Sequence, residues 1–454
     1  MKTDLVLLLP EIIIALGVVF ALIAEMLRSS RLALLISLAA LLLATGFTAP
    51  MLGLDTSVFD GTYRIDTLSI WAKLILLPAT VLSILMVRSE MGGCDREGAI
   101  YVLLVLVTLA SVLLSGAADT MILVLGVLLS GLGSFALVAY PRNDAATEAS
   151  MKFFVFASVT GAIMVFGLSY WFAGTGSTLF DDLSLLSDKP VLAVLGLLAV
   201  LVGLGYKSAL VPFHFWAPDA YDGAPISIAA YMSVVPKIGA IFALAQVVSD
   251  LPPSSGWPLA VSILAVLSMT YGYLAALVQS NIVRLLAYSS IAQAGYFLLA
   301  IVGIGTSKLA IPALIVFAAA YVAMNLGAFA IIMRTGRMLR DLSGIGRNHI
   351  ALGVAMVIFL LSLVGIPPLA GFVGKFLLFA AAIESGFIWL VVIAILNSVL
   401  SLAVYLRMIV PMYQQNDQGL ELKFMPLITT VWLLSLIFTI GIGLAAQALL
   451  GRIG

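Results

Sequence analysis

The sequence is a succession of long apolar runs separated by short polar joins, and this pattern leaves few folds open to it. A helix that crosses a bilayer needs about 20 mostly apolar residues. Backbone groups inside the hydrocarbon must bond to one another, so runs of this length fold as helices. Hydrophobic residues make up 63% of the chain and charged residues 10%, whereas soluble domains are roughly half apolar. We therefore predict an all-α, polytopic membrane protein with no sizeable soluble domain.

The apolar runs predict about 14 transmembrane helices. The first run lacks a positively charged leader and a small-residue cleavage site, so we expect a helix there and not a signal peptide. The predicted spans are 5–27, 31–50, 66–87, 98–115, 118–140, 150–173, 190–211, 225–249, 257–279, 284–304, 308–333, 350–380, 384–411 and 424–449.

Basic residues are distributed unevenly among the joins, and this asymmetry predicts the orientation. Lysine and arginine concentrate on the cytoplasmic side of membrane proteins, so we expect the odd-numbered joins in the cytoplasm and both termini outside. The even-numbered joins carry only Arg64, Lys189 and Lys308. The odd-numbered joins carry Arg28, Arg31, Arg88, Arg96, Arg142, Lys152, Arg284, Arg334, Arg337, Arg340, Arg347, Arg407 and Lys423.

Among the basic residues that belong neither to a join nor to a terminus, four lysines, Lys73, Lys207, Lys237 and Lys375, fall inside predicted spans. A lysine near the bilayer centre costs about 2.5 to 3.5 kcal/mol on insertion, so an intramembrane lysine indicates a functional site by default. Lys73 lies within two turns of its helix start, and we expect it to reach the interface with its long side chain. The other three lysines are the candidate functional residues.

Each of these three lysines lies near a helix-breaking proline. Pro236 immediately precedes Lys237, Pro212 follows Lys207, and the pair Pro367 and Pro368 precedes Lys375. A proline frees a backbone carbonyl inside a membrane helix, which is tolerated where protein or trapped water satisfies it. We therefore predict that the seventh and twelfth helices are broken beside hydrated cavities; ordinary kinks in a packed bundle are the alternative.

The two predicted breaks are five helices apart, as expected if helices 4–8 and 9–13 are repeats. An odd number of helices in each unit requires the two copies to be inverted in the membrane, which places polar sites near the midplane. The predicted divisions are N-terminal helices in 1–97, a first repeat in 98–249, a second repeat in 250–412 and a C-terminal helix in 413–454.

Redox cofactors and metals are not expected in this chain. Cys94 is its only cysteine, which excludes disulfides and cysteine-ligated clusters within the chain. The scattered Gly-x-Gly pairs lie in or beside apolar spans, where they favour close helix packing and not dinucleotide binding.

Three stretches, "VPFHFWAPDAYDGAP", "RLLAYSSIAQAGY" and "LVGIPPLAGFVGKF", resemble the signature segments of the antiporter-like membrane subunits of respiratory complex I, the NADH:quinone oxidoreductase. The resemblance covers nearly the whole chain, beginning at "LLPEIIIALG". It implies inverted five-helix repeats and proton transport driven by quinone reduction elsewhere in the complex. It also implies a bacterial inner membrane and, as partners, other membrane and peripheral subunits, the lipid bilayer and the quinone pool, but no nucleic acid. NADH, flavin, iron–sulfur clusters and quinone would bind to other subunits.

The resemblance also implies roles for individual residues. Lys207 corresponds to the family's lysine on the broken seventh helix, Lys237 to the connecting lysine of the eighth and Lys375 to the terminal lysine of the twelfth. His214 matches the histidine of the family's "PFH" element. It is either part of the polar axis between the lysines or a histidine that hydrogen-bonds at the helix break.

The chain departs from the family pattern at two positions. A glutamate that pairs with the seventh-helix lysine is typical of the fifth helix, but here the stretch is "VLGVLLSGLGSF" and Leu128 takes that place. A tenth-helix histidine is replaced by Gln293, which can hydrogen-bond within a water chain but cannot carry charge. The partner of Lys207 would then be Glu148, Asp222, an acid of another subunit, or nothing.

If Lys207 has no partner, it should stay neutral and pumping should be weakened or rewired; Leu128→Glu would then change the protons moved per quinone. Asp222 and Asp219 lie in a predicted cytoplasmic loop, where they either gather protons or are simply solvated. Glu11, near one end of the first helix, is expected to make interfacial or intersubunit contacts.

Buried lysines suit proton transport because burial can lower a lysine's pKa from about 10.4 by roughly 3 to 5 units, and a nearby carboxylate raises it again. Two other functions remain open. A subunit of a multisubunit sodium/proton antiporter would share the fold and the lysines. A membrane scaffold that transports nothing would fit the loss of the glutamate at Leu128, although a scaffold could avoid the insertion cost of three lysines.

Overall fold

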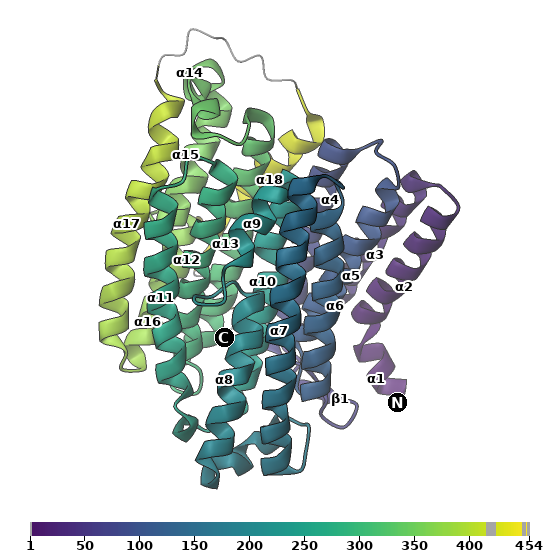
Figure 1. Cartoon of the computed structure of the whole chain (residues 1–454), viewed down its shortest axis with the longest axis vertical. Coiled ribbons are helices and arrows are strands. Elements are labelled where there is room, and N and C mark those ends of the chain that lie inside the picture. Colours follow the sequence, from purple (N-terminus) through teal and green to yellow (C-terminus); the bar gives the residue numbers. More distant parts are fainter. Residues whose placement is uncertain (1, 415–423, 447–450, 452–454) are drawn as a thin grey trace. The chain divides into compact units, whose positions relative to one another are not determined.

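The computed structural model describes residues 2–414, 424–446 and 451, and these residues are predominantly helical (Figure 1). The α-helices are α1 (Lys2–Leu7), α2 (Leu9–Met26), α3 (Ser30–Thr48), α4 (Thr67–Met91), α5 (Glu97–Ser115), α6 (Thr120–Ala139), α7 (Asp144–Thr175), α8 (Pro190–Lys207), α9 (Trp216–Gly223), α10 (Ile226–Asp250), α11 (Trp257–Leu277), α12 (Ile282–Val302), α13 (Ala310–Thr335), α14 (Ile345–Asn348), α15 (Ile350–Val364), α16 (Ala370–Glu384), α17 (Ile388–Met412) and α18 (Pro426–Leu444).

Short elements connect some of these helices. Within the described residues, 3₁₀ helices occur at η1 (Ala49–Met51), η2 (Asp181–Asp188), η3 (Pro253–Ser255) and η4 (Leu339–Leu342). The antiparallel strands β1 (Thr56–Val58) and β2 (Tyr63–Ile65) form a hairpin between η1 and α4.

The described helices confirm an all-α, multi-pass membrane fold. Thirteen helices are long and apolar enough to cross a membrane. The predicted span 350–380, the twelfth, is divided at its predicted break into two shorter helices, α15 and α16. Lys423 and residues 447–449 of the last predicted span lie outside the described residues.

Asparagine or aspartate begins several of the spans, because a short polar side chain can accept hydrogen bonds from the otherwise unpaired first N–H groups of a helix. Asp66 forms a reciprocal capping box with Ser69 at the start of α4. Asp119, Asn143 and Asn281 accept in the same way at the starts of α6, α7 and α12.

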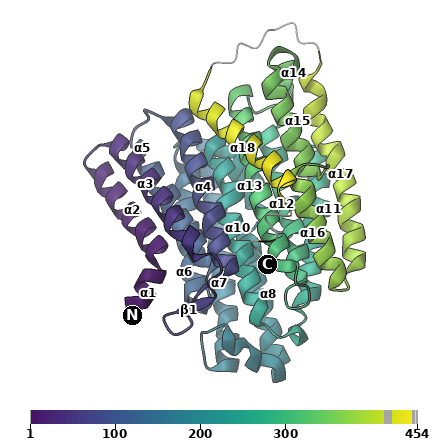
Figure 2. The same ribbon diagram turned by 180° about the vertical axis from the view of Figure 1, so that it is seen from behind.

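The chain forms two compact units. Unit 1 comprises Met1–Ile84, Met91–Trp216 and Val235–Val261, and unit 2 comprises Leu85–Glu90, Ala217–Val234 and Ser262–Gly454. Within unit 1, α2 packs against α3 and α5, as both views show (Figures 1 and 2). Within unit 2, α18 packs against α13 and α16 (Figure 2). In the most apolar stretches of α12 and α13, 94% of the residues are buried, so these two helices form much of the interior of unit 2.

Both predicted helix breaks are present. The first separates α8 from α9: Pro212 follows a cis peptide bond, and Ala209 has a φ of 57°. The second separates α15 from α16, with a cis bond between Pro367 and Pro368. A break leaves the last carbonyl groups of the preceding helix without intrahelical partners. The side chains around the breaks therefore decide what satisfies these groups.

Candidate functional site

Lys207 is the last residue of α8, and its side chain is only 1% exposed. Its Nζ lies 5.9 Å from the centre of the Phe153 ring on α7. The two helices approach closely because small residues face one another: a Cβ on Gly167 would lie 1.9 Å from the Cβ of Ala199. Lys207 therefore lies at the broken end of α8, a helix that packs tightly against α7 within unit 1.

An aromatic cluster holds the chain in place across this break. Phe153 stacks on Trp216 with ring centres 4.2 Å apart. The Trp216 indole N–H donates to the carbonyl of Tyr206 at 2.8 Å, and the Tyr206 hydroxyl donates to the carbonyl of Phe153 at 2.8 Å. These bonds tie the end of α8 to the start of α9 and to α7. The break is therefore a defined structure that fixes the position of Lys207.

Lys207 and Leu128 line the same cavity in unit 1, which has a volume of about 90 Å³. Other walls of the cavity come from α6 and α7. Leu128 is thus an α6 residue whose side chain lines the same cavity as Lys207. With leucine there, the cavity wall formed by α6 is apolar.

Lys237 lies inside α10 and is 2% exposed. Two residues further on, a Cβ on Gly239 would lie 2.8 Å from the Cβ of Ser111, so α10 packs directly against α5. His214, in the first break, is 3% exposed and close enough to Lys237 for their charges to interact. The structure therefore brings His214 and Lys237 together within unit 1.

Lys375 lies on α16 in unit 2 and is 3% exposed. Its Nζ donates a hydrogen bond of 2.9 Å to the carbonyl of Val364, the last residue of α15. The same Nζ lies 4.1 Å from the centre of the Tyr296 ring, in a cation–π contact. A cation at a helix C-terminus is favourable because the unpaired carbonyls carry partial negative charge. Lys375 thus supplies a hydrogen-bond donor to one of the carbonyls that the second break leaves without an intrahelical partner.

Gln293 lies beside the same helix end and is fully buried. Its amide nitrogen donates to the carbonyl of Leu363 at 3.0 Å and to the Tyr273 hydroxyl at 3.1 Å. Gln293 and Lys375 therefore bind neighbouring carbonyls of α15. The Tyr405 hydroxyl, 2.6 Å from Ser289 Oγ, extends these polar contacts towards α17.

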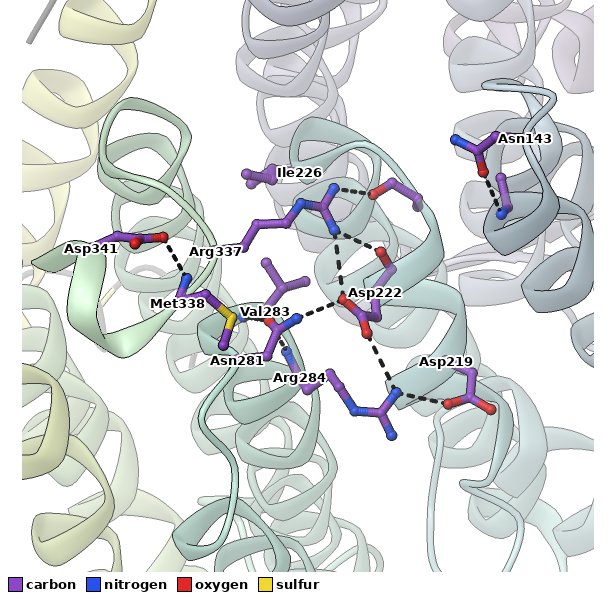
Figure 3. A network of polar contacts seen from close by, with 12 residues as sticks. Asn143, Asp219, Asp222, Ile226, Asn281, Val283, Arg284, Arg337, Met338 and Asp341 are labelled. Carbon is purple, nitrogen blue, oxygen red and sulfur yellow. Dashed lines mark hydrogen bonds and ion pairs between the residues drawn. The ribbon is translucent and has the colours of Figure 1, made fainter.

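Asp222 and Asp219 do not lie in a loop, as the sequence suggested; both lie on the short helix α9. Asp219 Oδ1 lies 2.9 Å from Arg284 Nη1. Asp222 Oδ1 accepts a 2.7 Å hydrogen bond from Asn281 Nδ2 and lies 3.7 Å from Arg337 Nη1 (Figure 3). Asp222 Oδ2 lies 3.6 Å from Arg284 Nη1. Asp219 and Asp222 therefore lie beside arginine side chains, and both remain about a third exposed.

Glu148, another predicted accessory acid, forms an ion pair of 2.7 Å with Lys152 one turn along α7. Its side chain is 68% exposed. The contact seen for Glu148 is thus a surface pair, of a kind that contributes about 0.3 to 0.5 kcal/mol on a helix.

Lys73 does not reach the interface, contrary to the sequence expectation. Its side chain is fully buried, and its Nζ lies 2.6 Å from Oε1 of Glu11 on α2, which is also buried. The Tyr63 hydroxyl donates to the same oxygen at 2.8 Å. A signal for this pair existed: Glu11 and Lys73 lie at similar depths in spans that we predict to enter from the same side. Matching opposite charges by depth would have found it.

Comparison with protein families matches residues 117–401 to the family described as "NADH:quinone oxidoreductase/Mrp antiporter, TM". The NADH-quinone oxidoreductase subunit N 1 of Streptomyces griseus is 36% identical over 426 residues, which cover 91% of this chain and 90% of the relative. Subunit N of Paramagnetospirillum magneticum is 36% identical over 465 residues, with coverage of 96% and 93%.

Solved structures show the same fold. A chain of respiratory complex I from Thermus thermophilus, solved with bound aureothin, has a TM-score of 0.85 at 29% identity, covering 98% of this chain and 99% of that one. A chain of the Mrp complex from Dietzia has a TM-score of 0.86 at 20% identity, with coverage of 100% and 96%. This chain therefore belongs to the NADH:quinone oxidoreductase/Mrp antiporter transmembrane family, and its near full-length relatives include N subunits of NADH-quinone oxidoreductases.

Proposed function

We propose that this chain is a proton-translocating membrane-arm subunit of NADH:quinone oxidoreductase, driven by quinone reduction in other subunits. The observation that carries the proposal is the burial of three lysines: Lys207, Lys237 and Lys375 are 1%, 2% and 3% exposed. Lys207 and Lys237 lie in helices long and apolar enough to span a membrane, and Lys375 lies on the shorter helix α16 that follows the second break. Each such cation costs insertion energy that a scaffold could avoid. The similarity to N subunits over most of the chain supports the choice of complex.

The lysines would act by holding and releasing protons in turn. Moving one charge against a potential of about 150 mV costs roughly 3.5 kcal/mol. For an ammonium in an apolar environment, a change in burial or in a nearby charge alters the free energy of protonation by a similar amount. The tyrosine and serine hydroxyls beside Gln293 would carry the hydrogen-bonded path in unit 2, and His214 would continue the path from Lys237 in unit 1.

The proposed setting is a bacterial inner membrane, with the chain assembled among the other membrane and peripheral subunits of the complex. NADH, flavin, iron–sulfur clusters and quinone would be held by those subunits. This chain would supply only the proton path.

Lys237→Met tests the proposal in the assembled complex. In inverted membrane vesicles supplied with NADH, we expect fewer protons taken up for each NADH oxidised, while the complex remains assembled. Lys237→Arg should lower the ratio similarly, because arginine keeps the charge but does not release its proton. Proton uptake would be followed with a pH-sensitive dye and oxidation by NADH absorbance. A wild-type ratio in both variants would rule the proposal out.

The fold is shared with a chain of the Mrp complex, so the antiporter alternative is tested as well. The dependence of proton movement on sodium separates the two functions. An antiporter subunit would exchange sodium for protons, so a sodium gradient alone would move protons in vesicles without NADH. Our proposal expects proton movement that requires NADH and persists without sodium.

Cys94 provides a test of the predicted orientation, because it is the only cysteine and lies in the exposed join between α4 and α5. Burial and the nearby Glu97 raise the pKa of its thiol above 9.0, so labelling should be slow at neutral pH and faster as the pH rises. We expect a membrane-impermeant maleimide at pH 8.5 to label Cys94 in inverted vesicles but not in spheroplasts. Cys94→Ser is the control, and labelling in spheroplasts would reverse the orientation.

A further inference from the structure

The ammonium of Lys207 lacks a charge partner in the part of the chain that the structure describes. Its Nζ is buried and has no hydrogen-bond partner there. Leaving a buried charge unpaired costs several kcal/mol, far more than a paired one. In the isolated chain, Lys207 therefore has no counter-charge to offset the cost of burying its ammonium.

The cavity beside Lys207 opens onto an apolar face of unit 1. Its walls include Leu128, Leu132 and Phe154, which are 51%, 61% and 45% exposed. A volume of about 90 Å³ exceeds the roughly 10 to 15 Å³ that one water molecule needs, and it leaves room for a carboxylate group entering from outside. An unpaired ammonium thus lines a cavity that can be reached from the protein surface.

We propose that this cavity receives an aspartate or glutamate side chain from a transmembrane helix of a neighbouring subunit, which becomes the counter-charge of Lys207. The inference rests on the proposed function only in assuming that the chain is assembled in a complex. It assigns the face around Leu128 and Leu132 as an intersubunit contact. The acid that this chain lacks on α6 would then be supplied by its neighbour.

Two acids near the ends of the cavity's helices, Glu148 and Asp119, make contacts away from Lys207. Glu148 pairs with Lys152. Asp119 accepts bonds from the N–H groups of Met121 and Ile122 at the start of α6. The missing charge is therefore expected to come from outside the chain.

The depth of the cavity favours a protein side chain over an anionic lipid. Leu128 and Leu132 lie eight and twelve residues into the 20-residue helix α6. At about 1.5 Å per residue they are roughly 12 and 18 Å from its start, near the middle of the span. Lipid headgroups lie at the two ends of such a helix.

Photo-crosslinking in the assembled complex tests the contact directly. With p-benzoylphenylalanine in place of Leu132, irradiation should link this chain to a transmembrane peptide that contains Asp or Glu. The same probe combined with Lys207→Met should give several-fold less of that adduct, whereas Lys207→Arg should preserve it because the charge remains. Native electrophoresis would confirm assembly of each variant before irradiation.

The inference would be overturned if the probe linked only to lipid, or to a peptide that contains no acid. It would also be overturned if the adduct formed in equal yield without the charge of Lys207. The readout does not depend on proton transport. If the adduct forms as expected but lysine substitutions leave transport intact, the proposed function fails and the intersubunit contact stands.

A second test compares Leu128→Glu with Leu128→Gln, which have similar size and differ in charge. A second carboxylate beside one already present should repel it, so we expect fewer protons per NADH for the glutamate variant than for the glutamine variant. A higher ratio for Leu128→Glu than for both Leu128→Gln and wild type would mean that Lys207 had no carboxylate partner, and would overturn the inference.

Discussion

Replacing Lys207, Lys237 and Lys375 together by methionine is expected to abolish proton movement through this subunit while NADH oxidation continues. Methionine is similar in length but carries no titratable group, so the apolar packing around the three buried side chains is largely kept. The protons moved per NADH in reconstituted vesicles should fall at least as far as in any single variant. The ratio should then reach the value set by the other subunits.

A matched control uses three lysines whose side chains are exposed. Lys152, Lys189 and Lys308 are exposed, so replacing them together by methionine removes the same number of charges without touching a buried site. This control triple should keep the wild-type ratio. An unchanged ratio in the buried triple, with normal assembly, would leave the chain as a structural member of its complex.

Lys73→Met is expected to have the largest effect on stability. The substitution leaves the Glu11 carboxylate buried without the ammonium that lies 2.6 Å away. Breaking a buried ion pair by removing one partner costs about 3 to 5 kcal/mol. We expect a lower unfolding temperature of the purified protein in detergent, and less assembled complex in the membrane.

Glu11→Gln combined with Lys73→Met should recover much of the lost stability, because no unpaired charge then remains and the glutamine can still accept from Tyr63. Lys308→Met, at an exposed site, serves as the control and should change the unfolding temperature little. If the double variant were as unstable as Lys73→Met alone, an unpaired Glu11 charge would not be the cause.

The membrane fold could be predicted from the sequence because hydropathy and proline act locally. Runs of about 20 apolar residues predicted most of the spans, although α7 begins six residues before the predicted span, and Pro212 and the pair Pro367 and Pro368 marked the two breaks. Both rules need only neighbouring residues and the bilayer. The inverted repeats and the roles of the lysines stay predictions.

Partners far apart in sequence were harder to predict. The contact of Glu11 with Lys73 and those of Asp222 with Arg284 and Arg337 depend on how helices pack, which composition does not determine. Nor did any local pattern indicate that Lys375 and Gln293 bind adjacent carbonyls of α15. The cavity shared by Leu128 and Lys207 likewise became visible only with the three-dimensional arrangement of α6, α7 and α8.

The bond from Lys375 to the carbonyl of Val364 couples two equilibria at the end of α15. An ammonium binds that carbonyl more strongly than a neutral amine does, because a charged donor makes the stronger hydrogen bond. Losing a proton at Lys375 must therefore loosen the end of α15, and any displacement of that helix end must alter how tightly Lys375 holds its proton. Thermodynamic reciprocity requires the two effects to be equal in free energy. A conformational signal arriving at α15 can in this way be converted into proton release, and proton binding into motion of the backbone.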